Sequence, residues 1–446
     1  MKFTKWNTVM LVVAGLLAPS AAVLAPTASR ADEAITTQTT ARAGHYTPAA
    51  GVLFNNPLEP EGSHRINRHI RLSINSSPQG SKIRVMSWNI KSDLYVRSLI
   101  DAHKRGVSVR IIMSNGLAED QSSSGAYSKL KSALSKGNRT RPARMRSWVR
   151  TCKASCRGVH GIAHAKYYIF SHTGKARYVV MVGSANMTEV AASNQWNDMF
   201  TVVGRTKVYS RYLKVFAEAA LDQRADPPYQ SFTDRDLRGW FLPYAGPAAT
   251  GDPVLKVLNR IKCNGATGRS GIDGHTAIRI AQTAFLNQRG IDIAEKLHDL
   301  YNAGCNIKLV YAVMGGQAGT RLWSSAGRGP IPSRHIVQDT DQDDEYDRYL
   351  HMKDMTISGV YDGRTNAHVV YNGTQNWTQV SFNSDEAGFV VRRESLERRY
   401  AKWINFLFNN PPPYYGRPIM GKAMIGTDHE TYSPATAHRY RGVDLY

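Results

Sequence analysis

The sequence is poor in acidic residues. Only 35 Asp and Glu stand against 57 Lys and Arg in 446 residues, so the formal net charge is +22 at pH 7. Such a balance argues against a cationic partner and favours a polyanionic one, such as nucleic acid or an anionic lipid surface. The alternative is a basic surface that serves solubility alone.

Long apolar runs are also absent after the N-terminus. Beyond residue 31, no stretch reaches the roughly 18 consecutive apolar residues of a membrane-spanning helix. The apolar run VMLVVAGLLAPSAAVLA follows Lys2 and Lys5 and leads to small residues at 29–31. This pattern predicts a signal peptide over residues 1–31 and a secreted, extracellular protein. A retained membrane anchor is the alternative, and Pro19 and Pro26 argue against it.

Cysteines are few, and their number is even. In an exported protein the four cysteines predict two disulfides, for which three pairings are open. We favour the two local pairs because each lies within one half of the chain. No second Cys or His cluster follows CKASC at zinc-site spacing, so no zinc site is expected. The favoured pairs are Cys152–Cys156 and Cys263–Cys305.

A strand–helix–strand pattern occurs twice, at 82–114 and 277–314, and each helical stretch ends at a glycine. The chain is also long for a single core. We therefore expect a duplicated α/β fold, with two halves that each contain a mixed β-sheet flanked by helices, packed around one shared active site. The expected boundaries are a flexible lead-in at 32–50, an N-terminal half at 51–225, a linker at 226–253, a C-terminal half at 254–410 and a Pro/Gly/Tyr-rich tail at 411–446.

A second duplication carries the chemistry. HAK in the first half and HMK in the second are each followed by a β-rich run and then by Gly-Ser/Thr-x-Asn, as GSAN and GTQN. In a strand, alternate residues face the same side, so each His lies beside its Lys. A single His-x-Lys means little, whereas two copies at similar spacing are hard to obtain by chance. The resulting candidates are His164, Lys166, Ser184 and Asn186, and His351, Lys353, Thr374 and Asn376.

These motifs resemble those of the phospholipase D superfamily, over roughly residues 83–408. The resemblance implies a phosphodiesterase that works through a phosphohistidine, with His164 as nucleophile and His351 as acid/base. The two lysines neutralise the phosphate, so no metal or other cofactor is expected. Asp198 and Glu386 resemble the family's acidic residue that orients the histidine of the partner motif.

The sequence departs from the family pattern where the full motif carries an aspartate five residues after each lysine. Ser171 and Ser358 occupy these positions. Some phosphodiesterases of the superfamily lack that aspartate, so catalysis is still expected. The departure puts the closest phospholipase subgroups in doubt.

Two other groups of residues are weaker candidates for a metal site. His160 and His172 flank the first motif, and we interpret them as surface or rim histidines. The acidic run DTDQDDEYD at 339–347 resembles a calcium loop but lacks the required Gly and Glu, so a solvated loop is favoured over weak calcium binding.

Residues 136–157 contain eight basic residues and no acidic one. This stretch could contact nucleic acid or an anionic membrane, where Met145 and Trp148 would enter the headgroups. The favoured function is a secreted phospholipase D that hydrolyses phospholipids or transfers the phosphatidyl group to alcohols, as a monomer. The alternatives are a secreted metal-independent nuclease of the same superfamily and a catalytically silent binder of anionic surfaces.

Overall fold

The structure is a computed structural model that describes residues 45–115, 125–245, 251–413, 430–441 and 443. The predicted signal peptide and most of the predicted lead-in fall outside these residues. Within them, no helix has the length and apolar character needed to cross a membrane.

The first half is built on a seven-stranded mixed sheet with the order β1-β8-β6-β5-β2-β3-β4. β2 pairs in parallel with β3, and antiparallel with β5. The strands are β1 (Gly51–Phe54), β2 (Lys82–Met86), β3 (Ser108–Ser114), β4 (Trp148–Cys152), β5 (Tyr167–Thr173), β6 (Ala176–Gly183) and β8 (Asp198–Val202). The helices are α2 (Pro60–Ser63), α3 (Arg65–Asn75), α4 (Asp93–Lys104), α6 (Ala126–Ser135), α7 (Glu189–Ser193) and α8 (Thr206–Ala219), with short 3-10 turns at Asn138–Thr140 and Ala143–Met145.

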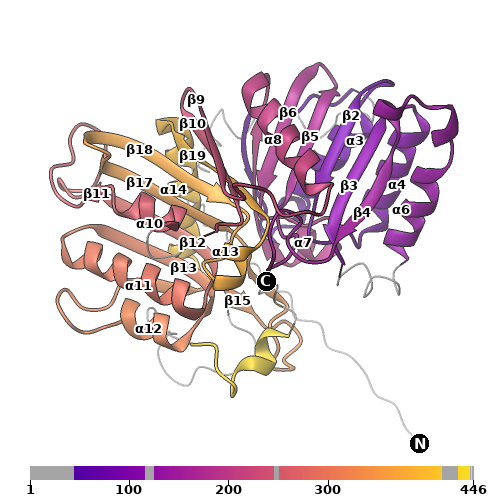
Figure 1. The fold of residues 1–446 in the computed structure, drawn as a ribbon. Helices are drawn as coiled ribbons and strands as arrows, with labels where there is room; N and C mark the ends of the chain where they lie inside the picture. Colours follow the sequence, from indigo (N-terminus) through magenta and orange to yellow (C-terminus); the bar gives the residue numbers. More distant parts are fainter. Residues whose placement is uncertain (1–44, 116–124, 246–250, 414–429, 442, 444–446) are drawn as a thin grey trace, which may run out of the picture. The chain divides into compact units, whose positions relative to one another are not determined.

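The second half repeats this arrangement on a nine-stranded sheet, in the order β14-β13-β12-β17-β18-β19-β10-β9 with β11 paired to β17. Figure 1 shows the two sheets with helices packed against them. The strands are β9 (Gln230–Asp234), β10 (Leu237–Leu242), β11 (Ile261–Lys262), β12 (Ala277–Phe285), β13 (Asn306–Met314), β14 (Ser333–His335), β17 (Lys353–Tyr361), β18 (Arg364–Gly373) and β19 (Glu386–Arg392). The helices are α10 (Pro253–Leu258), α11 (Asn287–Asn302), α12 (Gly316–Leu322), α13 (Gln379–Asn383) and α14 (Glu394–Asn409), and a 3-10 turn spans Ala437–Tyr440.

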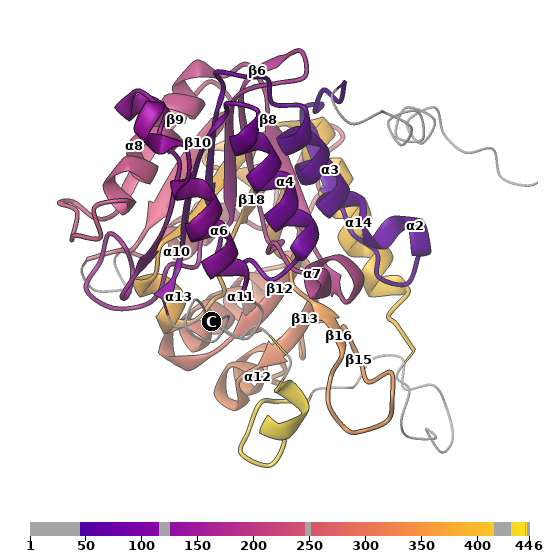
Figure 2. The same cartoon turned by 90° about the vertical axis from the view of Figure 1, so that its right-hand side faces the viewer.

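The expected α/β fold with mixed sheets flanked by helices is confirmed. In each half a parallel pair, β2–β3 or β12–β13, is joined by a helix, α4 or α11. Figure 2 shows α3, α4 and α6 covering one face of the first sheet. Both connecting helices end where a glycine takes a left-handed conformation, at Gly106 with φ 92° and Gly304 with φ 106°.

The segment 226–253, which the sequence predicts to be a linker, contains regular structure. β9 and β10 form a hairpin that extends the second sheet, with Leu242 opposite Glu386 at its end. The alternating pattern of LRGWFL explains the strand, because Leu237, Gly239 and Phe241 face one side while Arg238, Trp240 and Leu242 face the other. The dense Pro and Gly around the hairpin masked this signal in the sequence.

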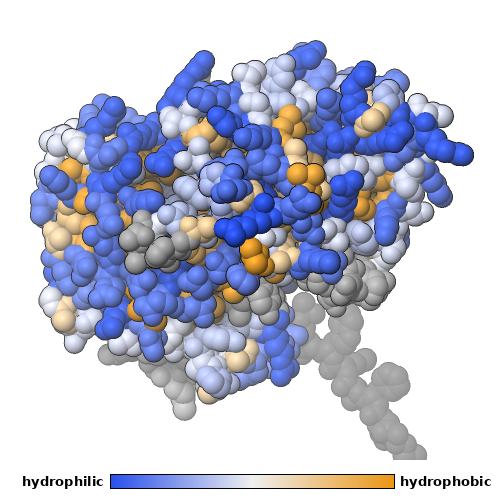
Figure 3. All heavy atoms as spheres, in the orientation of Figure 1, coloured by the Kyte–Doolittle hydropathy of each residue, from blue (hydrophilic) through white to orange (hydrophobic). Residues whose placement is uncertain are grey.

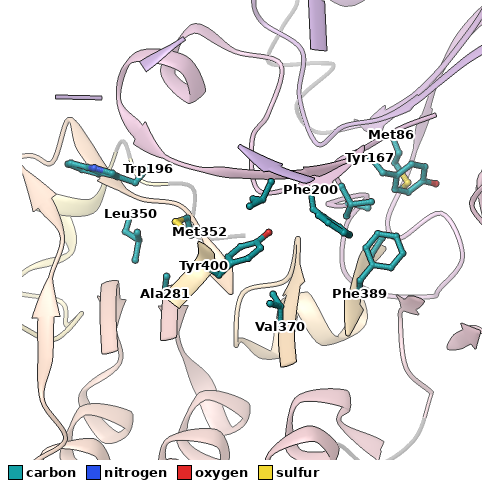
Figure 4. Packing of buried hydrophobic residues seen from close by; sticks show 14 of the residues in the cluster. Met86, Tyr167, Trp196, Phe200, Ala281, Leu350, Met352, Val370, Phe389 and Tyr400 are labelled. Atoms are coloured by element: carbon teal, nitrogen blue, oxygen red, sulfur yellow. The ribbon is translucent and has the colours of Figure 1, made fainter. Parts of the chain in front are cut away.

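One hydrophobic cluster spans both halves. Figure 4 shows part of it, with Phe200, Phe389 and Tyr400 brought together from different elements. Phe200 and Phe389 meet edge to face with ring centroids 5.7 Å apart. Burial of this apolar surface stabilises the joined halves, and the described residues of both halves belong to one compact unit.

The structure contains both predicted disulfides, Cys152–Cys156 and Cys263–Cys305. The first closes a tight loop directly after β4. The second joins the segment after β11 to the start of β13, across 42 residues of chain.

A third, small sheet connects the two halves. It contains β15 (Val337–Gln338), β16 (Arg348–Leu350) and β7 (Gln195–Trp196). β16 precedes the second His-x-Lys motif and pairs in parallel with β7 of the first half. This pairing places the second motif against the first half.

Candidate active site

The first His-x-Lys motif lies just before β5 and pairs with the second half. His164 N donates to Asp385 O at 3.2 Å, and Asp385 N donates to Ile162 O at 3.0 Å. The second motif is held in the same way, because His351 N donates to Trp196 O at 2.9 Å. Each motif is therefore bound to the segment that follows the Asn motif of the opposite half.

The structure brings the predicted residues into one buried group. Five of the six residues are fully buried, and Lys353 has only 1% of its surface exposed. The five are His164, Lys166, Asn186, His351 and Asn376. Each histidine lies close enough to both lysines for their charges to alter its pKa. The two halves thus contribute to a single site at their junction.

Glu386 orients His164. The His164 Nδ1 atom lies 2.7 Å from Glu386 Oε1, and the Thr374 hydroxyl donates to the other carboxylate oxygen. A proton on Nδ1 is fixed by this carboxylate, which leaves a lone pair on Nε2. Within the described residues, His164 Nε2 has no hydrogen-bond partner. This nitrogen is therefore available to a phosphorus atom.

The structure places Asn197, and not the expected Asp198, against His351. Asn197 Oδ1 lies 2.9 Å from His351 Nδ1 and also accepts from the Ser184 hydroxyl at 2.7 Å. The Asn197 amide nitrogen donates to Ala191 O and to Gln195 Oε1, which fixes the orientation of the amide. His351 Nδ1–H therefore donates to a neutral oxygen.

Asp198 faces a different set of groups. Its carboxylate accepts from the Tyr400 hydroxyl at 2.8 Å and from Ser184 N at 3.2 Å. Neighbouring residues in a strand point to opposite sides. A prediction that is off by one position therefore assigns the His351 contact to Asp198 and not to Asn197. The sequence contains a signal for the correct register, because Asn197 and Glu386 each precede a core phenylalanine by three positions, in NQWNDMF and NSDEAGF.

The lysines are held by their own motifs. Lys166 Nζ donates to His164 O at 2.7 Å and lies 5.7 Å from the centre of the Trp88 ring. Lys353 Nζ donates to His351 O and, at 2.8 Å, to the Thr283 hydroxyl. These contacts fix both ammonium groups beside the histidines.

Burial and charge together set the protonation of the histidines. Burial lowers the pKa of His164 well below its ordinary value, and Lys166 and Lys353 lower it further. Burial has the same effect on the pKa of His351, with Lys353 and Lys166 adding to it. Both imidazoles are therefore neutral in the free protein at neutral pH, and the lysines supply the positive charge of the site.

Burial raises the pKa of two carboxyl groups near the lysines. The pKa of Glu386 rises to about 7, against the opposing effect of Lys166. Burial and the neighbouring Asp198 raise the pKa of Asp354 well above its ordinary range, and both carboxyl oxygens of Asp354 lack a hydrogen-bond partner within the described residues. Both shifts favour the neutral acids and so reduce the negative charge beside the lysines.

The two serines that replace the motif aspartates have structural contacts. The Ser171 hydroxyl accepts from Lys82 N at 2.8 Å, and the Ser358 hydroxyl accepts from Gly271 N at 3.1 Å. Both therefore satisfy backbone donors of neighbouring segments. Neither belongs to the buried group of histidines, lysines and asparagines.

The candidate metal ligands also lie elsewhere. In the part of the chain that the structure describes, one group of three metal-ligating side chains is found, Asp339, Asp341 and Asp347. Asp339 uses both carboxylate oxygens to accept backbone N–H groups of its own loop. His160 is exposed and His172 is half-buried on β5.

The basic segment 136–157 is only partly available to a partner. Six of its eight cationic side chains are exposed, Arg141 is half-buried, and Arg157 is buried in an ion pair with Glu218. Trp148 stacks on Phe216 at 5.8 Å, and Arg150 lies 4.6 Å from the centre of its ring. Trp148 therefore packs on Phe216 and is half-buried.

Comparison with known proteins agrees with this geometry. Residues 70–220 match the family described as "Cardiolipin synthase, PLD-like domain". No curated protein matches the sequence. Among solved structures, phosphatidylserine synthase of Haemophilus influenzae Rd KW20 has a TM-score of 0.51 at 10% identity, over 86% of this chain and 91% of its own.

Two other structures show weaker likeness. Polyphosphate kinase of Porphyromonas gingivalis has a TM-score of 0.49 at 14% identity over 80% of this chain, which spans 47% of the kinase. Nuc of Salmonella typhimurium, a phospholipase D family member, has a TM-score of 0.29 at 21% identity, over 39% of this chain and 95% of Nuc.

The fold is the phospholipase D-like α/β fold. Residues 70–220 are similar to the PLD-like domain family, and the second half repeats the mixed sheet flanked by helices.

Proposed function

We propose that this protein is a metal-independent phosphodiesterase of phospholipase D type that acts on phospholipids. The observation that carries the proposal is the convergence of two His–Lys pairs in one buried site, with a carboxylate behind only one of the two histidines. This arrangement provides a nucleophile, a proton donor and an anion site without a metal ion.

In the first step, His164 Nε2 attacks phosphorus while the bond to the leaving oxygen breaks. His351 Nε2–H gives its proton to that oxygen, so the alcohol leaves neutral and the phosphoryl group stays on His164. The lysines and the Asn186 and Asn376 amides stabilise the charge on the non-bridging oxygens. The anionic phosphate offsets the lysine charges, which raises the pKa of His351 and allows it to carry the required proton.

In the second step, neutral His351 accepts a proton from water or an alcohol, whose oxygen attacks phosphorus. The phosphorus–nitrogen bond breaks and returns the electron pair to His164. Hydrolysis and transfer to an alcohol therefore differ only in the attacking molecule.

The roles of the histidines are tested by trapping the intermediate on phosphorus-labelled substrate. Label should survive an alkaline quench and disappear in acid, since phosphohistidine is acid-labile. The label should be absent in His164→Ala, which lacks the nucleophile. It should accumulate in His351→Asn, because that variant still forms the phosphohistidine on His164 but cannot activate water to hydrolyse it. Label found on His351 in the His164→Ala protein would reverse the two roles.

Two observations support a phospholipid substrate. The matching family and the phosphatidylserine synthase are named for lipid chemistry. A secreted location, inferred from the N-terminal sequence and consistent with the two disulfides, would give access to lipid outside the cell.

Nucleic acid is the second candidate substrate, and the surface favours it. The exposed cations of residues 136–153 can contact a phosphate backbone, and the packing of Trp148 on Phe216 leaves less apolar surface for a bilayer. On the face shown in Figure 3, apolar residues are scattered among hydrophilic ones.

The substrate is decided by incubating the purified protein with mixed phospholipid vesicles and, separately, with plasmid DNA, both in EDTA. We expect headgroup release from the vesicles. Nicking of the plasmid without headgroup release would make the protein a nuclease. If neither substrate reacts, the protein is a silent binder, and loss of headgroup release only in EDTA would overturn metal independence.

A further inference from the structure

A cavity of about 260 Å³ lies in the second half, outside the catalytic group. It is bounded by the β9–β10 hairpin, by residues of β17, β18 and β19, and by α10. The residues that line this cavity include no histidine, lysine or asparagine of the catalytic group.

Positive charge dominates the lining of this cavity. The one acidic side chain there, Asp236, is already paired with Arg205 at 3.1 Å and Arg393 at 2.6 Å. Arg260 and Arg392 share the carboxylate of Asp362. The cationic residues of the lining are Arg235, Arg238, Lys256, Arg260 and Arg392.

Three of these cations have no ion pair within the described residues, namely Arg235, Arg238 and Lys256. Like charges that converge on a concave surface repel one another and raise the local concentration of anions. A ligand with two negative charges would relieve this repulsion.

The floor of the cavity is aromatic. Trp240 and Tyr371 stack with ring centroids 5.4 Å apart, and each has only 1% of its surface exposed. Tyr229 and Tyr361 add to the aromatic lining.

The floor lies directly behind the second catalytic motif. A Cβ atom at Gly373 or Gly388 would come within 2.6 or 2.2 Å of the Trp240 ring, so these glycines allow the ring to lie on the sheet. The Tyr371 hydroxyl accepts from Gln375, which stands between Thr374 and Asn376. The cavity is therefore next to the motif and separate from the site.

We propose that this cavity binds a phosphate monoester attached to a planar ring, of which a nucleoside 5′-monophosphate is the simplest example. The phosphate pairs with Arg238 and Lys256, and the ring packs against the aromatic side chains that line the cavity. This site is additional to the proposed phosphodiesterase and does not depend on it, because a monoester offers no diester bond to cleave.

The test is isothermal calorimetry of the full protein with adenosine 5′-monophosphate at fixed ionic strength. We expect one saturable site per chain. Adenosine and inorganic phosphate should each bind at least about tenfold more weakly, because each lacks one of the two groups. The absence of saturable binding of adenosine 5′-monophosphate would overturn the proposal.

Substitutions then place the ligand. Arg238→Ala and Lys256→Ala should each weaken binding by about tenfold, because each removes a cation that pairs with the phosphate. Arg97→Ala, which removes an exposed cation from α4, is the matched control and should leave binding unchanged. Loss of binding in Lys353→Ala together with normal binding in Arg238→Ala would assign the ligand to the catalytic site and overturn the proposal.

Discussion

The two histidines of the candidate site have different partners, although the halves that supply them are equivalent. His164 donates to the carboxylate of Glu386, and His351 donates to the amide oxygen of Asn197. A carboxylate makes an imidazole more basic than an amide oxygen does. The difference favours His164 as the nucleophile and His351 as the group that releases its proton readily.

The first prediction concerns Asn197. Asn197→Ala should lower kcat by about 10- to 100-fold with little change in KM, because the His351 ring loses its orientation. Asp198→Asn, the neighbouring control, should lower kcat far less, since that carboxylate contacts Tyr400 and Ser184 instead. Equal losses in both variants would mean that Asn197 acts only through folding.

The second prediction uses pH. Asn197→Asp places a carboxylate beside His351, which raises the pKa of the imidazole because it favours the charged form. His351 then keeps its proton to higher pH, so the alkaline limb of the kcat profile should move upward by about one pH unit. A pH profile identical to that of the wild type would contradict the orienting contact.

At the scale of elements, Arg289 ties the second Asn motif to α10. It pairs with the buried Asp252 and donates to Asn376 O at 3.0 Å and to Thr378 O at 3.2 Å. Removing one member of a buried pair leaves an uncompensated charge. Asp252→Ala should therefore lower the free energy of unfolding by about 3 kcal/mol in chemical denaturation. Asp292→Ala, on the exposed side of α11, is the control and should have little effect.

The disulfides should differ in their effect on stability. The Cys263–Cys305 pair closes 42 residues of chain, and the Cys152–Cys156 pair closes only four. Loop-closure entropy predicts losses of about 4 kcal/mol and about 2 kcal/mol, respectively, when each pair is replaced by serines. Urea denaturation of the two double variants measures this difference, and a larger loss for the short loop would contradict the entropic account.

Features of the fold and the site that depend on local sequence motifs could be predicted, and features that depend on contacts between distant segments could not. The His-x-Lys and Asn motifs, the fold class and both disulfides follow from local spacing and from duplication. The partner of His351 was missed, because the choice between Asn197 and Asp198 depends on strand register, and the signal in NQWNDMF and NSDEAGF appears only when the two segments are aligned on their phenylalanines. The burial of Arg157 and the packing of Trp148 were also missed, since a run of charge does not tell which side chains face inward.

At the scale of the whole molecule, the junction of the halves contains ionisable groups that respond to pH. Asp385 accepts from the Ser155 hydroxyl at 3.0 Å and from Cys156 N, and burial raises its pKa to about 7 from 3.8. A raised pKa means that its contribution to stability is full below pH 4 and is lost as the pH rises through 7.

Asp385→Asn removes this dependence and keeps an oxygen for both donors. Relative to the wild type, the variant should therefore gain stability as the pH rises from 5 to 8, by about 1–3 kcal/mol. Denaturation curves at the two pH values measure the gain. A constant difference between the two proteins would show that the Asp385 carboxyl has an ordinary pKa in the fold.

The pairing of residues 162–164 with Asp385 also means that the site can be assembled only late in the synthesis of the chain. A ribosome makes His164 more than two hundred residues before the carboxylate that holds it, so a partial chain carries the nucleophile without Glu386 or His351. Under the proposed mechanism such a partial chain has no reaction to perform, and activity begins only when synthesis has passed Glu386.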